Sequence, residues 1–307
     1  MPNSLQSNQT PLSLLLILII LSLGTYLIVP VIFMSLGVEI LGISLEEFMR
    51  KIGTEDPEPP GQLVLILVQG ASSVLSFIVV PAFFVKKYEE SSLTSYFHSR
   101  WINTNAMVLT LGLTLSLMVV NSLLIEWNMN VKFPESLASS FDRMEEQGRL
   151  MTEYLTDFYS LPYFLMVLIV VAVVPAIGEE LLFRGLIQKY LQHIWKNPHL
   201  AIWATAIFFS AFHMQFYGFV PRMVLGTFFG YLFYYSGNLW YASVAHFVNN
   251  GLTLVMIYLF QQGIVEFDIE GTESVSIWPT MVFAIIGAVL FVLFRKQFHI
   301  TDNLKNE

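Results

Sequence analysis

An uncharged run that ends in three charged residues is the feature that most limits what this chain can fold into. The run extends from Leu161 to Gly178 and is long enough for a helix that crosses a bilayer. Glu179, Glu180 and Arg184 follow it directly. One ionisable side chain at the bilayer centre costs about 2.5–3.5 kcal/mol, whereas each Leu, Ile, Val or Phe contributes only about 0.3–0.6 kcal/mol to insertion. Three such charges therefore indicate a site that uses them.

The composition indicates a membrane protein. Hydrophobic residues make up 55% of the 307 residues and charged residues only 12%, against about 25% charged in soluble domains. This composition makes the lipid bilayer the expected surroundings of the chain. The net charge of −8 and the lack of a basic cluster argue against a nucleic-acid partner. The absence of cysteine excludes disulfides, cysteine nucleophiles and thiolate metal ligands.

Hydropathy predicts an all-α, polytopic integral membrane bundle of about eight transmembrane helices. The predicted spans are residues 12–34, 62–84, 107–125, 161–183, 200–217, 219–235, 239–260 and 277–294. The stretches 35–61 and 127–160 are less apolar, and each is predicted either as an interfacial amphipathic helix or as an ordinary loop. An excess of Lys and Arg on the side that carries both termini predicts cytoplasmic termini for this multi-pass chain.

The three charged residues have different expected tasks. Glu180 and Arg184 stand four residues apart with the acid first, which is the favourable order for an ion pair on a helix. Glu179 points elsewhere on the helix and has no such partner in the sequence, so it is the candidate general base, with the pair as its support. The alternative, a solvated helix end at the membrane interface, is less favoured because uncharged residues continue on both sides.

Two later spans each add a polar group. Phe209 and His213 share a face of the fifth predicted span, and His246 and Asn250 share a face of the seventh. Each pair alone is typical of core packing or of helix–helix hydrogen bonding. Together with Glu179 they predict a site, because a carboxylate and an imidazole can deprotonate a water, while a second imidazole and a carboxamide can stabilise an oxyanion. The indicated reaction is hydrolysis of an amide without a covalent intermediate.

The same set leaves a metal open. Two His and one Glu are also the usual ligands of a catalytic zinc, and if a metal is present the predicted ligands are Glu179, His213 and His246. The sequence shows no carboxylate to orient each imidazole, since Glu180 is expected to serve Arg184. Water activation by Glu and His is therefore favoured over a tightly held zinc, and no cofactor is assigned.

These motifs resemble those of a known family. Glu179-Glu180 with Arg184, Phe209 with His213, and His246 with Asn250 occur in the order characteristic of CPBP intramembrane proteases, a group that includes type II CAAX prenyl endopeptidases and bacteriocin-processing or immunity proteins. The resemblance covers about residues 160–255. It implies that Glu179 and His213 activate the water and that His246 and Asn250 form the oxyanion site.

On this interpretation the chain has three parts. Residues 1–160 form a variable N-terminal membrane region of about three helices with amphipathic or loop segments, residues 161–294 the protease core, and residues 295–307 a polar tail. The expected partner is a protein or peptide substrate, with a prenyl group or membrane anchor left open. The alternatives are a non-proteolytic scaffold or bacteriocin-immunity protein of the same fold, and a proton-coupled transporter, which the lack of an inverted repeat disfavours.

Overall fold

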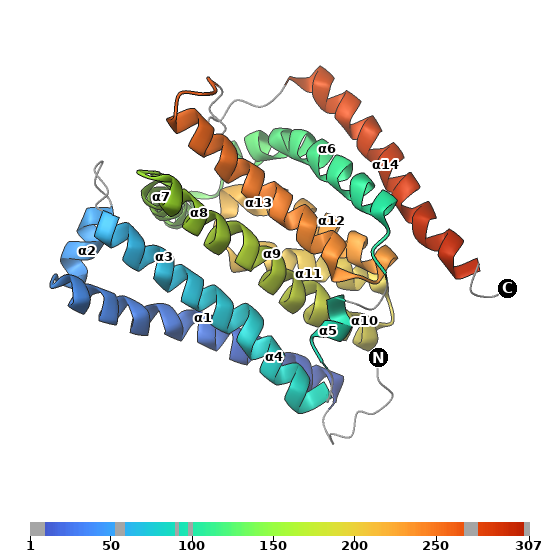
Figure 1. The fold of residues 1–307 in the computed structure, drawn as a ribbon, viewed down its shortest axis with the longest axis horizontal. Helices are drawn as coiled ribbons and strands as arrows, with labels where there is room; N and C mark the ends of the chain where they lie inside the picture. The colour runs from blue at the N-terminus through green and yellow to red at the C-terminus, as the bar shows by residue number, and fades with distance from the viewer. Residues whose placement is uncertain (1–9, 53–58, 90–91, 98–100, 267–275, 304–307) are drawn as a thin grey trace.

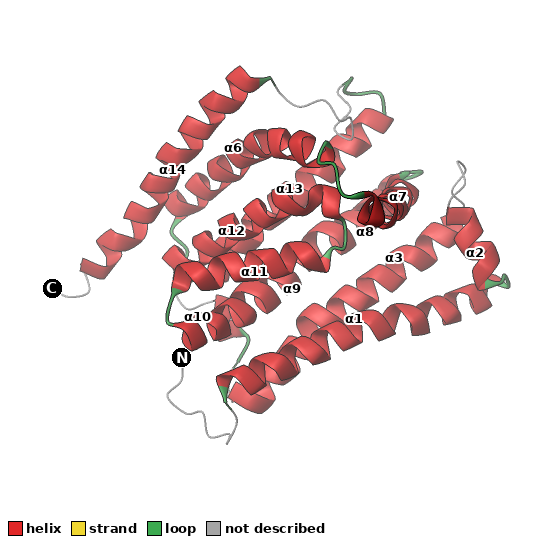
Figure 2. Ribbon diagram, turned by 180° about the vertical axis from the view of Figure 1, so that it is seen from behind, coloured by secondary structure: helices red, strands yellow, loops and turns green. Residues whose placement is uncertain are grey.

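Helices are the only regular elements in the part of the chain that the structure describes. The computed structural model describes residues 10–52, 59–89, 92–97, 101–266 and 276–303. Within these ranges no strand occurs, so the predicted all-α class is confirmed (Figure 2). The α-helices are α1 (Pro11–Leu41), α2 (Leu45–Ile52), α3 (Pro59–Val74), α4 (Val80–Phe84), α5 (Thr94–Phe97), α6 (Thr104–Met129), α7 (Glu135–Thr156), α8 (Leu161–Leu168), α9 (Val174–Glu179), α10 (Lys189–Trp195), α11 (Pro198–Phe212), α12 (Phe219–Ser236), α13 (Leu239–Gln261) and α14 (Ile277–Asn303). Four shorter segments are π-helical: η1 (Leu75–Val79), η2 (Val85–Glu89), η3 (Ile169–Val173) and η4 (Glu180–Gln188). A short 3₁₀ helix, η5 (Phe216–Gly218), precedes α12.

The long helices lie side by side in a fixed order (Figure 1). α1 contacts α3, α3 contacts α9, α9 contacts α13, α13 contacts α6, and α6 contacts α14 at the far edge. On the face seen from behind, α11 packs against α12 and against η4 (Figure 2). The helix that carries Glu179 and Glu180 therefore lies in the interior of the bundle, between α3 on one side and α11, α12 and α13 on the other.

Among the residues that the structure describes, six helices are long and apolar enough to cross a membrane. They are Pro11–Leu41, Pro60–Glu89, Thr104–Met129, Leu161–Trp195, Leu239–Gln261 and Ile277–Phe298. The outer helices expose large apolar side chains, such as Leu27 on α1 at 70% and Ile285 on α14 at 65%, which suits contact with lipid chains. The polytopic helical bundle is thus confirmed. α11 and α12 fall at the two other predicted spans, but α11 is shorter, and the count of eight stays a prediction.

The helix from Leu161 to Trp195 begins where the sequence predicts. The Ser160 hydroxyl accepts a hydrogen bond from the backbone N–H of Tyr163, and Pro162 stands in the first turn, where its missing N–H is not needed. The helix is interrupted by two π-helical segments, η3 and η4. Such segments are rare and are frequent at functional sites. All nine residues of η4 are buried.

The polar stretch 127–160 forms a helix for most of its length. α7 is amphipathic and packs against η5, the short turn after His213. Phe141 stacks on Phe216 with a centroid distance of 4.0 Å, and the Tyr217 hydroxyl donates to the Asp142 carboxylate at 2.6 Å. Of the alternatives left open for this stretch, the helix is the one observed.

The division into three parts stays a prediction. α6 belongs to the predicted N-terminal region, yet it packs against α12, α13 and α14. α14 continues without a break from the predicted core into the predicted tail, as far as Asn303, and residues 304–307 lie outside the described part.

Thiol labelling tests whether α11 crosses the membrane. Because the chain has no cysteine, Lys196→Cys before α11 and Met214→Cys after it each create a unique thiol. If α11 spans, a membrane-impermeant maleimide labels the first variant from one side of sealed vesicles and the second from the other. Labelling of both from the same side would contradict the eight-span prediction.

Candidate active site

A buried ion pair forms the base of the site. Arg184 Nη1 donates to Glu180 Oε1 at 2.8 Å, and both side chains are fully buried. The i, i+4 pair predicted from the sequence is therefore present. Arg184 also donates from Nη2 to the carbonyl of Gly226 on α12 at 3.0 Å. Its guanidinium lies 4.5 Å from the ring centroid of Phe209 and 5.4 Å from that of Phe229, so charge, hydrogen bonds and aromatic faces together compensate its burial.

Two glycines let α12 come close to this pair. A Cβ added at Gly226 would lie 3.2 Å from Arg184 Nη2, and one added at Gly230 would lie 2.8 Å from Gln188 Oε1. Gln188 donates to the Gly230 carbonyl at 3.2 Å, one turn beyond the contact of Arg184 with Gly226. The close approach of backbone and side chain explains why small residues stand at both positions.

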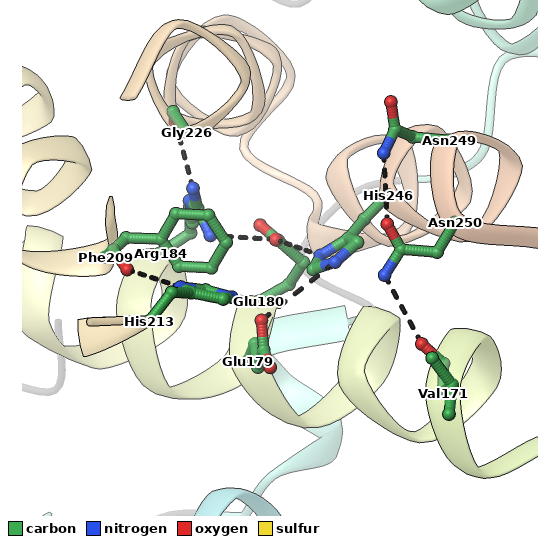
Figure 3. Close-up of polar contacts among 10 residues, drawn as sticks. All are labelled: Val171, Glu179, Glu180, Arg184, Phe209, His213, Gly226, His246, Asn249 and Asn250. Carbon is green, nitrogen blue, oxygen red and sulfur yellow. Dashed lines mark hydrogen bonds and ion pairs between the residues drawn. The ribbon is translucent and has the colours of Figure 1, made fainter. Parts of the chain in front are cut away.

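His246 lies between the two carboxylates (Figure 3). Its Nδ1 is 2.8 Å from Glu180 Oε1, and its Nε2 is 4.0 Å from Glu179 Oε2. Because a carboxylate only accepts, Nδ1 carries a proton, and in the neutral ring Nε2 then presents a lone pair toward Glu179. The ring also stacks on Phe229, with a centroid distance of 5.1 Å and an interplanar angle of 14°.

This arrangement corrects one expectation. Glu180 was expected to serve Arg184 alone, which would leave no carboxylate to orient an imidazole. The same oxygen of Glu180 accepts from Arg184 and from His246. Glu180 therefore orients His246 as well as neutralising Arg184.

His213 is oriented by backbone. It caps the C-terminus of α11, and its Nδ1 lies 2.9 Å from the Phe209 carbonyl. Since a carbonyl only accepts, Nδ1 carries the proton and Nε2 is left as an acceptor. The Phe209 ring lies 4.9 Å from the ring of His213 and 6.2 Å from that of His246. Figure 3 shows both imidazoles directed toward the space beside Glu179.

Asn250 is held by a backbone carbonyl of η3 and by the neighbouring Asn249. Its Nδ2 donates to the Val171 carbonyl at 3.3 Å, and its Oδ1 accepts from Asn249 Nδ2 at 3.0 Å (Figure 3). Pro175, four residues after Val171, has no N–H to donate to that carbonyl. The side chain of Asn249 thus contacts and helps to hold that of Asn250.

A tyrosine from α1 approaches the site as well. The Tyr26 ring stacks on Phe77 at 5.3 Å and lies 4.8 Å from the ring of Phe212. Tyr26 is not predicted from the sequence, because a single tyrosine in an apolar span has no ionisable partner three or four residues away that would indicate a site.

The site contains side chains of the types that bind zinc, but they do not lie close enough together to share one ion. Two imidazoles and a carboxylate are ligands that zinc accepts. Among the described residues, however, no three His, Asp or Glu side chains lie together closely enough to hold one ion. The contact of His246 Nδ1 with Glu180 does not itself oppose a metal, because Nε2 is the free ring nitrogen. The site as it stands does not fit a bound metal.

A comparison with protein families identifies the segment that carries this site. Residues 161–252 match the family model of the type II CAAX prenyl endopeptidase Rce1-like proteins. This segment belongs to the CPBP family. The match covers just under a third of the chain and includes all four candidate catalytic residues and their supporting residues. No curated protein and no solved structure matches the chain.

The apolar helices, together with the match of residues 161–252, support an integral membrane protein. The orientation of the termini stays a prediction.

Removing one partner of the buried pair tests its structural role. Arg184→Ala leaves the Glu180 carboxylate buried without its cation, a change that costs about 3–5 kcal/mol in buried pairs. We expect a large loss of folded protein, measured as the monodisperse fraction after extraction in mild detergent and as the midpoint of thermal unfolding.

The matched control is Arg149→Ala. Arg149 also pairs with acids three and four residues away, Glu146 and Glu153, but its side chain is half exposed. Its loss should leave the yield and the midpoint unchanged, because exposed pairs contribute little. Equal behaviour of the two variants would contradict the role given to Arg184.

Proposed function

We propose that the protein is an intramembrane endopeptidase that hydrolyses a peptide bond with a water activated beside Glu179. The observation that carries this proposal is the position of His246, fixed by Glu180 at Nδ1 and directed at Glu179 through Nε2. The separation of 4.0 Å between Nε2 and Glu179 Oε2 is too long for a direct hydrogen bond. It suits one water that bonds to both atoms, because each such bond is about 2.8 Å long.

The reaction follows from where the protons can go. Glu179 takes a proton from the attacking water, and the second O–H of that water donates to one of the two free imidazole nitrogens, Nε2 of His246 or Nε2 of His213. The resulting hydroxide adds to the carbonyl carbon of the peptide. The proton on Glu179 then passes to the departing amide nitrogen as the C–N bond breaks. The products are a carboxylic acid and an amine, and no covalent enzyme intermediate is needed.

The oxyanion of the intermediate is stabilised from α13. Asn250 has one amide N–H left to donate, because the other is directed to the Val171 carbonyl, and His246 donates from Nε2 when that atom is protonated. Nδ1–H of His246 donates a hydrogen bond to Glu180 whether the ring is neutral or protonated at Nε2. The ring therefore keeps its orientation through the reaction cycle. A donor of this kind contributes about 10²–10³ in rate.

The substrate is proposed as a membrane-anchored protein or peptide, and the residues described here do not specify a prenyl group. A non-proteolytic scaffold or immunity protein with the same fold would need the ion pair of Glu180 and Arg184 but not the free carboxylate of Glu179. The variant of Glu179 therefore separates the two functions.

Glu179→Gln should abolish cleavage and leave the protein folded. The change removes the proton acceptor and keeps the shape of the side chain, so we expect a fall in kcat of at least about 10³, somewhat more than for one oxyanion donor. The measurement is cleavage of a membrane-anchored reporter by purified protein in proteoliposomes, followed by mass spectrometry of the products.

Glu46→Gln is the matched control, since Glu46 is an exposed residue of α2. It should cleave at the wild-type rate. Full activity of Glu179→Gln would refute the mechanism, and a wild-type protein that cleaves no reporter while retaining a biological effect would favour the scaffold.

Chelation tests metal dependence. Because the described residues provide no cluster of three ligands, we expect dialysis against a strong chelator to leave the rate of reporter cleavage unchanged. Metal content is measured on the same sample by mass spectrometry. Stoichiometric zinc, with activity lost on removal and restored by its return, would overturn this expectation and assign Glu179, His213 and His246 as ligands.

A further inference from the structure

The chain turns back between α11 and α12 over residues 213–218, and His213 is the first residue of this turn. The proposed role of His213 requires a fixed position for its ring beside Glu179. The Phe209 carbonyl orients the ring, but the backbone that carries the ring leaves the helix at this point. The next residue, Met214, has a φ of 56°, in the left-handed region that a methionine rarely adopts. Such a turn keeps one conformation only where surrounding contacts hold it.

Asn128, near the end of α6, holds the far end of the turn with both ends of its carboxamide. Its Nδ2 donates to the Phe216 carbonyl at 3.1 Å, and its Oδ1 accepts from the backbone N–H of Val220 at 2.7 Å. The residue is buried, with 3% of its surface exposed. One side chain from α6 therefore spans η5 and joins it to the first turn of α12.

The first turn of α12 depends on this contact, because the helix has no side-chain cap of its own. Its N-cap position is Gly218, which has no side chain that could accept a hydrogen bond. The N–H of Phe219 donates back into η5, and Pro221 has no N–H. Val220 is the residue between them, and the acceptor for its N–H comes from another helix. Asn128 thus replaces the missing N-cap.

The same turn of α12 is bonded to the residue that supports the backbone of His213. The Ser210 hydroxyl donates to the Phe219 carbonyl at 2.6 Å. The Ser210 carbonyl accepts from the backbone N–H of His213 at 3.2 Å. Because Phe219 directly precedes Val220, a short set of hydrogen bonds connects Asn128 with His213.

A second contact from α12 holds the middle of the turn. Arg222 donates from Nη1 to the side-chain oxygen of Gln215 at 3.2 Å and from Nη2 to the backbone carbonyl of the same residue. A Cβ added at Gly218 would lie 2.7 Å from the two terminal nitrogens of Arg222, so the glycine leaves room for the guanidinium. A shift of the first turn of α12 would therefore also move Gln215, two residues after His213.

We propose that Asn128 is a positioning residue for the reaction: it caps α12 from α6 and thereby holds the turn that places the His213 imidazole beside Glu179. The inference rests on the proposed function, because Asn128 acts on the reaction only through His213. Asn128 lies outside the segment that matches the family model, so α6 gains a role in the site.

Two variants separate the hydrogen bonds of Asn128. Asn128→Leu removes both. Asn128→Asp keeps an acceptor for Val220 at a helix N-terminus, where a carboxylate is favourable, and so is the milder change. The matched control is Asn130→Leu, since Asn130 follows the same end of α6, is exposed, and donates from its side chain to a carbonyl of its own helix.

A spectroscopic experiment tests the position of His213 without cleavage. Nitrogen-15 solid-state NMR of histidine-labelled protein in bilayers reports which ring nitrogen carries the proton, and the signal lost in His213→Gln assigns the residue. With Asn128 present, we expect one neutral form of His213, protonated at Nδ1, because the Phe209 carbonyl accepts there. In Asn128→Leu a second form, protonated at Nε2, should appear, while the signals of His246 stay unchanged.

The control Asn130→Leu should give the spectrum of the unchanged protein. If Asn128→Leu does not fold, Asn128→Asp carries the same comparison. An unchanged His213 signal in the folded variant of Asn128 would overturn the inference, and so would equal changes at His213 and His246, which would indicate general loosening of the bundle.

A kinetic experiment tests the same role in the active enzyme. A misplaced imidazole affects the chemical step, so we expect kcat for the membrane-anchored reporter to fall at least about tenfold in Asn128→Leu, and less in Asn128→Asp, with KM changed less than about twofold. Asn130→Leu should leave both values unchanged. A rise in KM with an unchanged kcat would mean that the turn binds substrate instead of positioning the imidazole, and it would contradict the inference.

The outcomes separate the two proposals. A changed His213 signal in Asn128→Leu, in a protein whose wild type cleaves no reporter, would contradict the proposed function and support the connection between Asn128 and His213. Wild-type cleavage with neither kcat nor the His213 signal altered in Asn128→Leu would contradict the inference and leave the proposed function standing.

Discussion

One oxygen atom connects the stability of the bundle to the geometry of the site. Oε1 of Glu180 accepts from Arg184 and from His246, each at 2.8 Å. The first contact lies within one helix and the second joins that helix to α13. Burying a carboxylate with a single partner is costly. Two donors to the same oxygen offset more of that cost, and they hold the Glu180 side chain in one position. The lone pair of His246 faces Glu179 because Glu180 stands on the other side of the ring.

The surroundings explain how such charges are tolerated at membrane depth. Arg184 extends across to α12, where the backbone carbonyl at Gly226 accepts its second donor, and the rings of Phe209 and Phe229 cover its faces. The same two rings contact the imidazoles, Phe229 by stacking on His246 and Phe209 through its edge and its carbonyl. Aromatic residues therefore position the polar groups as well as filling the core. Glu180 and Arg184 both lie in η4, a π-helical segment whose residues are all buried.

The sequence predicts the parts of this account that depend on local spacing. The helix start at Ser160 and the pair of Glu180 with Arg184 are readable because four residues make one turn and because caps have a signature. Contacts between distant residues carry no such signal. Nothing in the spacing shows that His246 reaches Glu180 or that Asn250 reaches the carbonyl of Val171, since helix packing decides both. For the same reason the sequence left residues 127–160 undecided between a helix and a loop.

The protonation of His246 tests the central claim most directly. Nitrogen-15 solid-state NMR of histidine-labelled protein in bilayers distinguishes a ring protonated at Nδ1 from one protonated at Nε2, and the loss of one signal in His246→Gln assigns it. The account predicts that the neutral ring of His246 carries its proton on Nδ1, where Glu180 accepts it, and leaves Nε2 free toward Glu179. A neutral His246 with its proton on Nε2 would mean that Glu180 does not orient the ring, and it would contradict the account.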